Sequence, residues 1–256
     1  MELIFIGTGS GKTSLKRNHS STLINSHSSN LLIDTGDGIS KALLLNKISF
    51  NSIDNILITH FHADHFSGFA SLITQMKLNN RKNKLSIFIQ KNFTDNLKNF
   101  LNITYLFPEI LGFDLKFYPI EINLPFKICP DISAIAKQNH HIVNKYKVDI
   151  REENFVSLSM LLNVDNKKIF YTSDIGENKD LYLFEDEKPD IMVSEITHIS
   201  FSEIYQAFKA NKSSNLFLTH IEDEKEQSIL NEINLLSEEE KNKIQLCNDG
   251  LRITFN

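Results

Sequence analysis

The sequence contains little cysteine, and its two cysteines, Cys129 and Cys247, lie far apart without a C-x-x-C partner. Their scarcity argues against a disulfide framework and against a zinc ribbon. Long apolar runs are also missing, so no segment approaches the roughly 20 residues of a membrane-spanning helix. The first residues lack the basic start and the long apolar stretch of a secretory signal. We therefore expect a cytoplasmic protein with no membrane partner.

No stretch rich in glycine, proline or serine divides the 256 residues, and no short-period repeat is visible. Apolar residues make up 41% of the chain and charged residues 23%, which is ordinary for a globular protein. A chain of this length can bury a substantial core. We expect a single domain that spans residues 1–256.

An excess of basic charge is absent as well, because 27 lysines and arginines face 32 aspartates and glutamates, for a net charge of −5. Such a balance argues against a broad basic face for nucleic acid. One local basic run remains, and we interpret it as a solvated helix end and loop. Its members are Lys77, Arg81, Lys82, Lys84 and Lys91.

A complete phosphate-binding loop is missing too. The segment from Gly7 to Ser14 reads G-T-G-S-G-K-T-S and follows an apolar strand. The P-loop pattern places its first glycine five positions before the glycine that precedes the lysine. Counted back from Gly11, that position is Ile6. We therefore predict a flexible glycine turn here and no ATP site.

The most informative residues that are present spell H-x-H-x-D-H between His60 and His65. Imidazole and carboxylate are both metal-ligand types. A β-branched run precedes the motif and a helical pattern follows it, which places the motif on a strand-to-helix turn. His60 and His62 leave an extended backbone on the same side, whereas Asp64 and His65 lie around the corner. This arrangement favours two metals over one, although three histidines in six positions could also arise by chance.

The pattern of the whole chain predicts strands mixed with helices in two similar halves. Residues 164–167 carry the signal of a hairpin turn between two strands. Helices are expected at 39–45, 66–78, 93–101, 202–209 and 224–236. Strands are expected at 3–6, 22–24, 31–33, 53–59, 85–89, 113–118, 132–136, 156–164, 168–172, 191–195, 215–219, 244–246 and 252–255.

With its H-x-H-x-D-H motif between a strand and a helix, the sequence resembles the metallo-β-lactamase superfamily. The resemblance implies an α/β fold with four αββα layers, two facing sheets covered by helices. It also implies a site at one edge between the sheets, and a glycine loop after the first strand that lies beside this site.

Further ligands should follow strands. Asp174 and His220 each close an apolar strand, although an aspartate there could equally be a turn or cap residue. Beyond the first motif, His140 and His141 are the only histidines before Asp174. Neighbouring side chains of a strand point in opposite directions, so only one of the two is the candidate. In the resembling families this ligand often follows an asparagine, as His140 follows Asn139, and we choose His140. The insertion at 142–154 blurs this register.

The resemblance then implies a complete dinuclear site. His60, His62 and His140 would hold one divalent cation. Asp64, His65 and His220 would hold the other, and Asp174 would bridge them. Asp34, which ends the strand at 31–33, would orient the ligand loop from outside the coordination sphere. We expect two divalent metal ions as cofactors, with Zn²⁺ first and Mn²⁺ or Fe²⁺ as alternatives.

Within the superfamily the second half resembles the ribonuclease Z and cyclic-phosphate phosphodiesterase branch. His198 lies where that branch carries a histidine that is not a ligand, and its setting His198-Ile199-Ser200 matches the branch motif in part. The chain also has the Asp-Gly-hydrophobic sequence that is common near the end of that branch, at Asp249 to Leu251. The long basic arm with which ribonuclease Z docks tRNA is not visible.

These features predict a metal-dependent hydrolase, a phosphodiesterase that cleaves a small cyclic phosphodiester or a nucleotide at the dinuclear site. Asp64 would accept a proton from the attacking water, and His198 would supply one to the leaving oxygen. The alternatives are a ribonuclease Z-type tRNA 3′ endonuclease and a sensor or scaffold that binds metal without catalysis. We thus favour a small phosphodiester or nucleotide over nucleic acid as the partner, and the sequence does not decide between a monomer and a homodimer.

Overall fold

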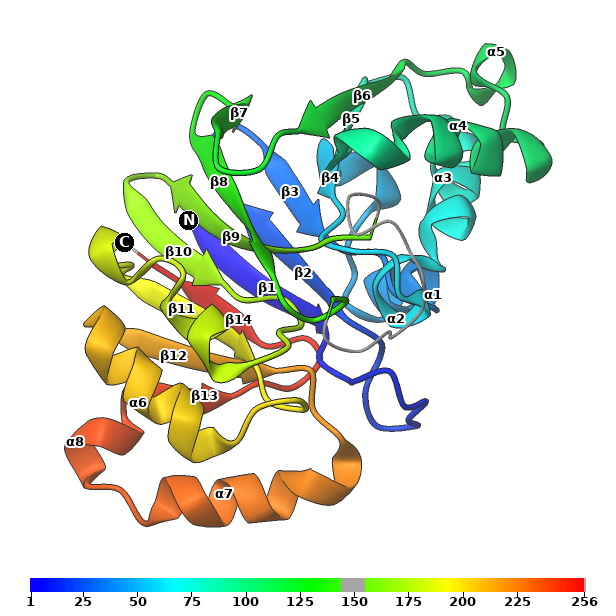
Figure 1. Cartoon of the computed structure of the whole chain (residues 1–256). Helices are drawn as coiled ribbons and strands as arrows, with labels where there is room; N and C mark the ends of the chain where they lie inside the picture. Colours follow the sequence, from blue (N-terminus) through cyan, green and yellow to red (C-terminus); the bar gives the residue numbers. More distant parts are fainter. Residues whose placement is uncertain (144–154, 256) are drawn as a thin grey trace.

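The computed structural model describes residues 1–143 and 155–255. Two seven-stranded sheets face each other, and helices cover their outer sides (Figure 1). The strand order is β14-β1-β2-β3-β4-β5-β6 in the first sheet and β13-β12-β11-β10-β9-β8-β7 in the second. The expected αββα sandwich is therefore confirmed. Most of the expected insertion at 142–154 lies outside the described residues.

The first sheet is built mainly from the N-terminal half of the chain. Its strands are β1 (Glu2–Gly7), β2 (Ser21–Asn25), β3 (Asn30–Ile33), β4 (Asn55–Leu57), β5 (Leu85–Gln90), β6 (Leu115–Ile120) and β14 (Arg252–Thr254). Its helices are α1 (Ile39–Leu45), α2 (Ala63–Phe66), α3 (Phe69–Leu78), α4 (Thr94–Ile103) and α5 (Pro108–Leu111), with short 3₁₀ turns η1 (Phe50–Ser52) and η2 (Lys91–Phe93).

The second sheet comes from the C-terminal half. Its strands are β7 (Pro125–Cys129), β8 (Ile132–Asn139), β9 (Ser157–Val164), β10 (Lys167–Tyr171), β11 (Ile191–Glu195), β12 (Asn215–Thr219) and β13 (Ile244–Leu246). The helices are α6 (Phe201–Asn211), α7 (Glu226–Asn234) and α8 (Glu238–Lys241), with 3₁₀ turns η4 (Asn178–Tyr182), η5 (Glu185–Glu187) and η6 (Asp223–Lys225).

Alternation along the strands separates three apolar cores. In β1, Leu3 and Phe5 face the second sheet, whereas Ile4 and Ile6 pack under the helices of the first half. The core between the sheets also includes residues of β8 to β12, and a third core lies under α6 and α7. Because each sheet is covered on both faces, its strands are almost continuously apolar.

The hairpin expected at 164–167 is confirmed. Asp165 and Asn166 have φ angles of 48° and 67°, and β9 and β10 pair antiparallel around them. One other expectation is wrong, and one strand was not among the expectations. The helix expected at 66–78 is broken between α2 and α3 near Gly68, where a Cβ atom would lie 2.4 Å from the carbonyl oxygen of Gly36. Strand β7 was not expected at all.

The basic run of the first half does not form a continuous basic surface. Arg81 is buried, and its guanidinium donates hydrogen bonds to the carbonyl oxygens of Asn51, Asn83 and Lys84. It therefore stabilises a turn. Among the described residues, every helix is too short or too polar to cross a membrane.

Parallel pairing places the carboxyl ends of several strands along one edge of the two sheets. β3, β4 and β5 run parallel in the first sheet, and β10, β11 and β12 run parallel in the second. β8 has the direction of β10, because both pair antiparallel with β9. The carboxyl ends of these strands therefore meet at one edge, the usual position of a site in such sheets.

Candidate metal centre

The H-x-H-x-D-H motif lies on the turn from β4 into α2, as its sequence predicts. His62 has extended backbone angles and precedes the first residue of α2, while Asp64 and His65 lie within the helix. The carbonyl oxygen of His65 accepts a hydrogen bond from the amide of Thr35, which ties the turn to the end of β3. His60, Asp64 and His65 are buried.

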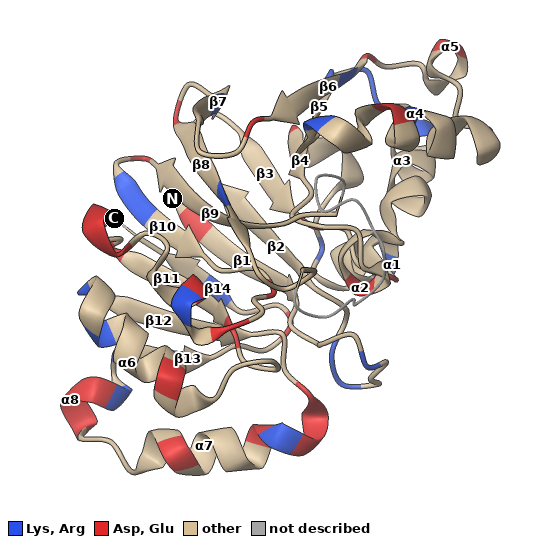
Figure 2. Cartoon of the chain, in the orientation of Figure 1, with Lys and Arg blue, Asp and Glu red and all other residues tan. Residues whose placement is uncertain are grey.

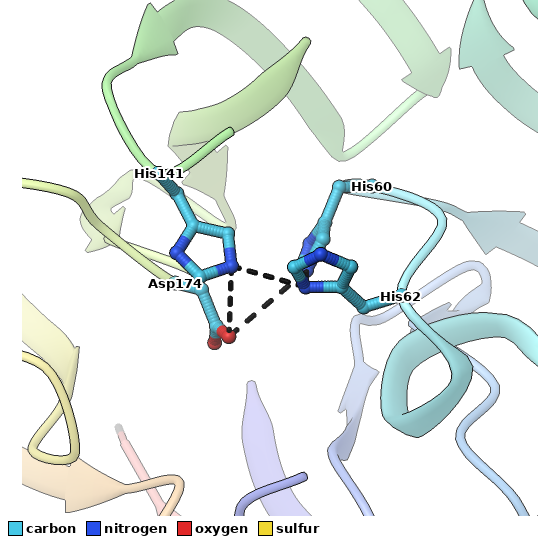
Figure 3. Close-up of side chains that lie close together, drawn as sticks. All are labelled: His60, His62, His141 and Asp174. Atoms are coloured by element: carbon cyan, nitrogen blue, oxygen red, sulfur yellow. Dashed lines mark hydrogen bonds and ion pairs between the residues drawn. The ribbon is translucent and has the colours of Figure 1, made fainter. Parts of the chain in front are cut away.

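A first group of side chains converges on one point, formed by His60, His62, His141 and Asp174 (Figure 3). Nδ1 of His62 lies 3.1 Å from Nε2 of His60 and 3.1 Å from Nε2 of His141. Oδ2 of Asp174 lies 3.5 Å from Nε2 of His141 and 4.0 Å from Nε2 of His60. Two of these residues come from the first sheet and two from the second.

The position of His141 corrects the choice made from the sequence. His141 is buried and points into the group, whereas the half-buried His140 turns away from it. Nδ1 of His140 lies 2.6 Å from Oδ1 of Asp180 and 3.1 Å from Oε1 of Glu177. The reason is the length of β8, which was expected to end at residue 136 but continues to Asn139. The residue at which the strand ends determines which of the two adjacent side chains faces the site.

A second group shares Asp174 and adds Asp64, His65 and His220. Nε2 of His220 lies 3.1 Å from Oδ2 of Asp64 and 3.3 Å from Oδ2 of Asp174. Nε2 of His65 lies 3.2 Å from Oδ1 of Asp174 and 3.6 Å from Oδ2 of Asp64. All four residues are buried. Asp174 thus stands between the two groups, where a bridging carboxylate would stand.

Both groups fit divalent cations. Four ligands at 2.0–2.1 Å from a tetrahedral ion are spaced about 3.3 Å apart, which is close to the separations found here. Nδ1 of His62 faces both Nε2 of His60 and Nε2 of His141. A proton can join only two of these three nitrogens in a hydrogen bond, whereas a cation can bind all three. Nε2 of His65 and Oδ1 of Asp174 are also buried and lie 3.2 Å apart without the geometry of a hydrogen bond.

The protonation equilibria of Asp174 and His60 fit a cation as well. Burial raises the pKa of Asp174, but the nearby His220 and His65 outweigh burial and hold that pKa well below its usual value. Burial and the neighbouring His65 lower the pKa of His60 well below its usual value. Ionised carboxylate and neutral imidazole are the forms in which these side chains bind metals. Burial lowers the pKa of His65, but the carboxylates of Asp174 and Asp34 outweigh burial and hold that pKa well above its usual value.

Asp34 holds the ligand turn from behind, as the resemblance implies. Its Oδ2 accepts hydrogen bonds from Nδ1 of His65 at 2.7 Å and from the hydroxyl of Thr59 at 2.8 Å, and its Oδ1 accepts the amide of Thr59 at 2.8 Å. The Ser173 hydroxyl donates to that of Thr59 at 2.8 Å. Burial raises the pKa of Asp34 despite the opposing charge of His65. Sequence reasoning missed Thr59 and Ser173.

His198 stands at the rim of the second group. Its ring lies 5.7 Å from that of His220 and 4.8 Å from that of His141, and 26% of its side chain is exposed. Nδ1 of His198 lies 3.1 Å from Oε1 of buried Glu195. Glu195 also accepts the amides of Thr197 and His198, at 2.6 and 3.0 Å. Sequence reasoning missed this orienting role of Glu195, although the pattern E-x-x-H was visible.

The glycine turn after β1 lies against the second group. Gly9 pairs with Ile221, which directly follows His220. A Cβ atom at Gly11 would stand 3.2 Å from Oδ2 of Asp64. The segment therefore lies beside the second group, as the resemblance implies.

An apolar cavity of about 320 Å³ adjoins the first group. The Phe93 ring lies 4.5 Å from that of Phe61 and 6.2 Å from that of Phe155. No sequence pattern indicated this cavity, because its walls come from segments far apart in the chain. They are His60, Phe61, His62, Phe93, Ile142, Phe155 and Val156.

Comparison with known proteins agrees with this geometry. The sequence pattern of the family described as anti-Pycsar protein Apyc1 matches residues 1–247. The chain is 27% identical to ribonuclease Z of Pyrococcus furiosus over 86% of each protein. It is 37% identical to ribonuclease Z of Thermoplasma acidophilum, over 50% of this chain and 40% of that relative.

Solved structures share the fold at low identity. The metallo-β-lactamase fold protein YhfI of Bacillus subtilis has a TM-score of 0.76 and 17% identity, with 98% of each chain covered. The short form of human tRNase Z has a TM-score of 0.73 and 16% identity, with 99% of each covered. Together, the ribonuclease Z relatives and the two groups of ligand-type side chains support a metal-dependent hydrolase with the metallo-β-lactamase fold.

Proposed function

The chain belongs to the family of anti-Pycsar protein Apyc1, and from this premise we propose that it is a phosphodiesterase for a small cyclic phosphodiester or a nucleotide. The observation that carries this proposal is the apolar cavity beside the two ligand groups. A cavity of this size with aromatic walls suits a flat aromatic group such as a nucleobase, whose faces can stack on the rings. The phosphodiester of the same molecule would then lie against the ligand groups.

The residues that would hold two divalent cations are those of the two groups. His60, His62 and His141 would bind one, Asp64, His65 and His220 the other, and Asp174 both. When bound, such a pair of cations would activate water and offset the charge that develops on the phosphoryl oxygens. Zinc suits this histidine-rich set, and Mn²⁺ or Fe²⁺ could occupy the same ligands.

The remaining chemistry falls to side chains of the chain itself. Burial raises the pKa of Asp64, but the hydrogen bond with His220 and the charge of His65 outweigh it and hold the pKa below its usual value. Asp64 is thus ionised at neutral pH, the form that can accept a proton from the attacking water, and its lowered pKa makes it a weaker base than an ordinary aspartate. Glu195 orients the His198 ring so that its other nitrogen, Nε2, can protonate the leaving oxygen.

The second candidate is a tRNA 3′ endonuclease, which the ribonuclease Z relatives favour. Two observations disfavour it. Between α4 and β7 the described chain carries only the short α5 and β6, so no long arm is inserted there. Acidic residues gather on α7 and α8, and the net charge is −5 (Figure 2). A large polyanion needs many cationic contacts.

The test is a substrate panel with the metal-loaded protein. Cyclic nucleotides, a linear dinucleotide, a base-free alkyl diester and a precursor tRNA with a 3′ trailer would be compared at equal enzyme concentration. We expect the cyclic and short nucleotides to be cleaved with the highest kcat/KM. Preferred cleavage of the precursor tRNA would overturn this proposal in favour of the endonuclease. Metal binding without turnover of any substrate would indicate a sensor or scaffold.

A further inference from the structure

Two ligand-bearing turns touch each other backbone to backbone. One follows β8 and carries His140 and His141, and the other follows β10 and carries Asp174 and Gly176. A Cβ atom at Gly176 would stand 2.2 Å from the carbonyl oxygen of His140 and 2.7 Å from the amide nitrogen of His141. Only glycine permits this approach, so the relative position of the two turns is tightly constrained.

Asp180 joins these turns from beneath. It belongs to η4 and is fully buried. Its Oδ2 accepts hydrogen bonds from the amides of His140, Gly176 and Glu177, at 3.0, 3.0 and 3.2 Å. Its Oδ1 lies 2.6 Å from Nδ1 of His140. One buried carboxylate is thereby bonded to donors of both turns, an arrangement that fixes geometry strongly.

Asn139 makes a second connection between the same turns. Its side-chain nitrogen donates to the carbonyl oxygen of Asp174 at 2.9 Å, and its side-chain oxygen accepts the amide of His141 at 3.1 Å. Asn139 is buried. The backbones of both ligands are thus held on two sides, by Asn139 within β8 and by Asp180 below.

His140, Glu177 and Asp180 also lie close enough together to resemble a cation site. Their contacts argue against one. The carboxylate of Asp180 already accepts three amides and the His140 ring, and that of Glu177 is paired with Lys179 at 2.6 Å. Because these carboxylates are already bonded to protein donors, the cluster has a structural role and does not bind a cation.

We propose that Asp180 is a positioning residue that sets His141 against Asp174, and that His140 serves this connection instead of binding metal. The inference rests on the proposed assignment of His141 and Asp174 as ligands. Residues that orient ligands from outside the coordination sphere typically change metal affinity by roughly 10- to 100-fold when they are removed. Because His141 would bind only one of the two cations, the effect should fall mainly on that cation.

The experiment measures metal binding without substrate. Metal-free protein is titrated with Zn²⁺ against a chromophoric chelator, and with Co²⁺ while the visible spectrum of each bound equivalent is recorded. The variants are Asp180→Ala, His140→Ala and His140→Asn, in which an amide nitrogen replaces the Nδ1 donor. Asp186→Ala, which removes an exposed carboxylate from the neighbouring η5, is the matched control.

We expect Asp180→Ala to weaken one Zn²⁺ equivalent by roughly 10- to 100-fold, with a changed spectrum for the corresponding Co²⁺. His140→Ala should weaken the same equivalent less, because the three amide bonds to Asp180 remain, and His140→Asn should restore it. Asp186→Ala should match the wild type.

Unchanged binding in Asp180→Ala, or equal weakening of both equivalents, would overturn the inference. If Asp180→Ala does not fold, the two His140 variants decide: a metal loss in His140→Asn as large as in His140→Ala would mean that the histidine itself is a ligand. Wild-type protein that binds two metals but cleaves no phosphodiester would contradict only the proposed function.

Discussion

His140 and His141 show how one residue step decides a role. Consecutive side chains at a strand end point in opposite directions, so one histidine reaches the buried groups and the other reaches Asp180. The same rule places His60 and His62 together, because they are two positions apart. What each side chain can bind therefore follows from the residue at which its strand ends.

Replacing His141 by alanine should remove one of two bound metals. The side chain supplies an imidazole to the first group only, so the second group keeps its four ligands. Turnover should fall by roughly 100-fold or more, because even the loss of a residue that only orients a ligand costs roughly 10- to 100-fold. Metal content by mass spectrometry and kcat on a cyclic nucleotide provide the measurement. Two metals retained at wild-type affinity would show that His141 is not a ligand.

The His198→Ala variant should keep both metals and lose rate according to the leaving group. General acid catalysis contributes roughly 100- to 10,000-fold, and it matters most for a poor leaving group such as a ribose alkoxide. An aryl oxide leaves without a proton, so bis-nitrophenyl phosphate should be affected far less. Equal losses on both substrates would assign His198 a binding role, and loss of metal would make it a ligand.

Replacing Phe93 by alanine should raise KM for nucleotides. A base that stacks on an aromatic ring gains about 1–3 kcal/mol, which corresponds to roughly 5- to 150-fold in affinity. A base-free diester should show an unchanged KM, because it does not fill the cavity. Phe107→Ala, which alters a partly exposed ring outside the cavity lining, is the control. An equal rise for both substrates would mean that Phe93 supports the site and does not contact a base.

Most of the candidate site could be predicted from the sequence, because its residues follow strands or lie in one short motif. Of the seven predicted ligands, the structure brings six together: His60, His62, Asp64, His65, Asp174 and His220. Their role as ligands stays a prediction. Thr59 and the aromatic cavity could not be predicted, since they depend on contacts between segments far apart in the chain. Glu195 lies only three residues before His198, so its role was open to prediction from the pattern E-x-x-H.

At the scale of elements, the strands of the two inner layers were predictable because both faces of each sheet are buried and their sequences are continuously apolar. The helix break at Gly68 was not, because it results from close contact with Gly36. Strand β7 was missed for another reason. It lies at the edge of its sheet, alternates between exposed and half-buried residues, and begins with Pro125.

The glycine loop after β1 offers a prediction at this scale. Buried Arg17 anchors it, with hydrogen bonds to the Cys247 carbonyl oxygen at 2.7 Å and to Glu226 at 2.9 Å. Arg17→Met should lower the free energy of unfolding by about 3 kcal/mol, since it leaves buried polar partners unpaired. Lys16→Met removes a partner of the same Glu226, but its side chain is 55% exposed.

The lysine variant should therefore change the free energy of unfolding by about 0–1 kcal/mol. Urea denaturation of both variants gives the comparison. If both lose the same amount, the buried guanidinium does not anchor the loop. If only Arg17→Met also loses affinity for the metal of the Asp64 group, the loop is coupled to the site through Gly11, which lies against Asp64.

At the scale of the whole molecule, the two sheets are joined in two ways. An apolar core fills the space between them, and the ligand groups at one edge take side chains from both sheets. His60, His62, Asp64 and His65 follow β4 of the first sheet, whereas His141, Asp174 and His220 follow strands of the second. The expectation of a single domain over residues 1–256 stays a prediction, and this double connection is the reason to keep it.

Bound cations should therefore stabilise the folded state by linking the sheets. A ligand present at 100 times its dissociation constant adds about 2.7 kcal/mol. For a chain of this size each kcal/mol raises the unfolding temperature by about 2–4 °C. Each metal should then raise it by about 5–10 °C over the value in excess chelator, as calorimetry can measure. His62→Ala should show only one such step.

The core between the sheets does not depend on the cations, so the metal-free protein should keep its far-ultraviolet circular dichroism at 25 °C. Its buried apolar side chains come from both sheets and pack against one another. An unfolding temperature that is the same in chelator and in Zn²⁺ would show that the ligand groups hold no metal. Loss of the circular dichroism signal on chelation would show instead that the cations, and not the core, hold the two sheets together.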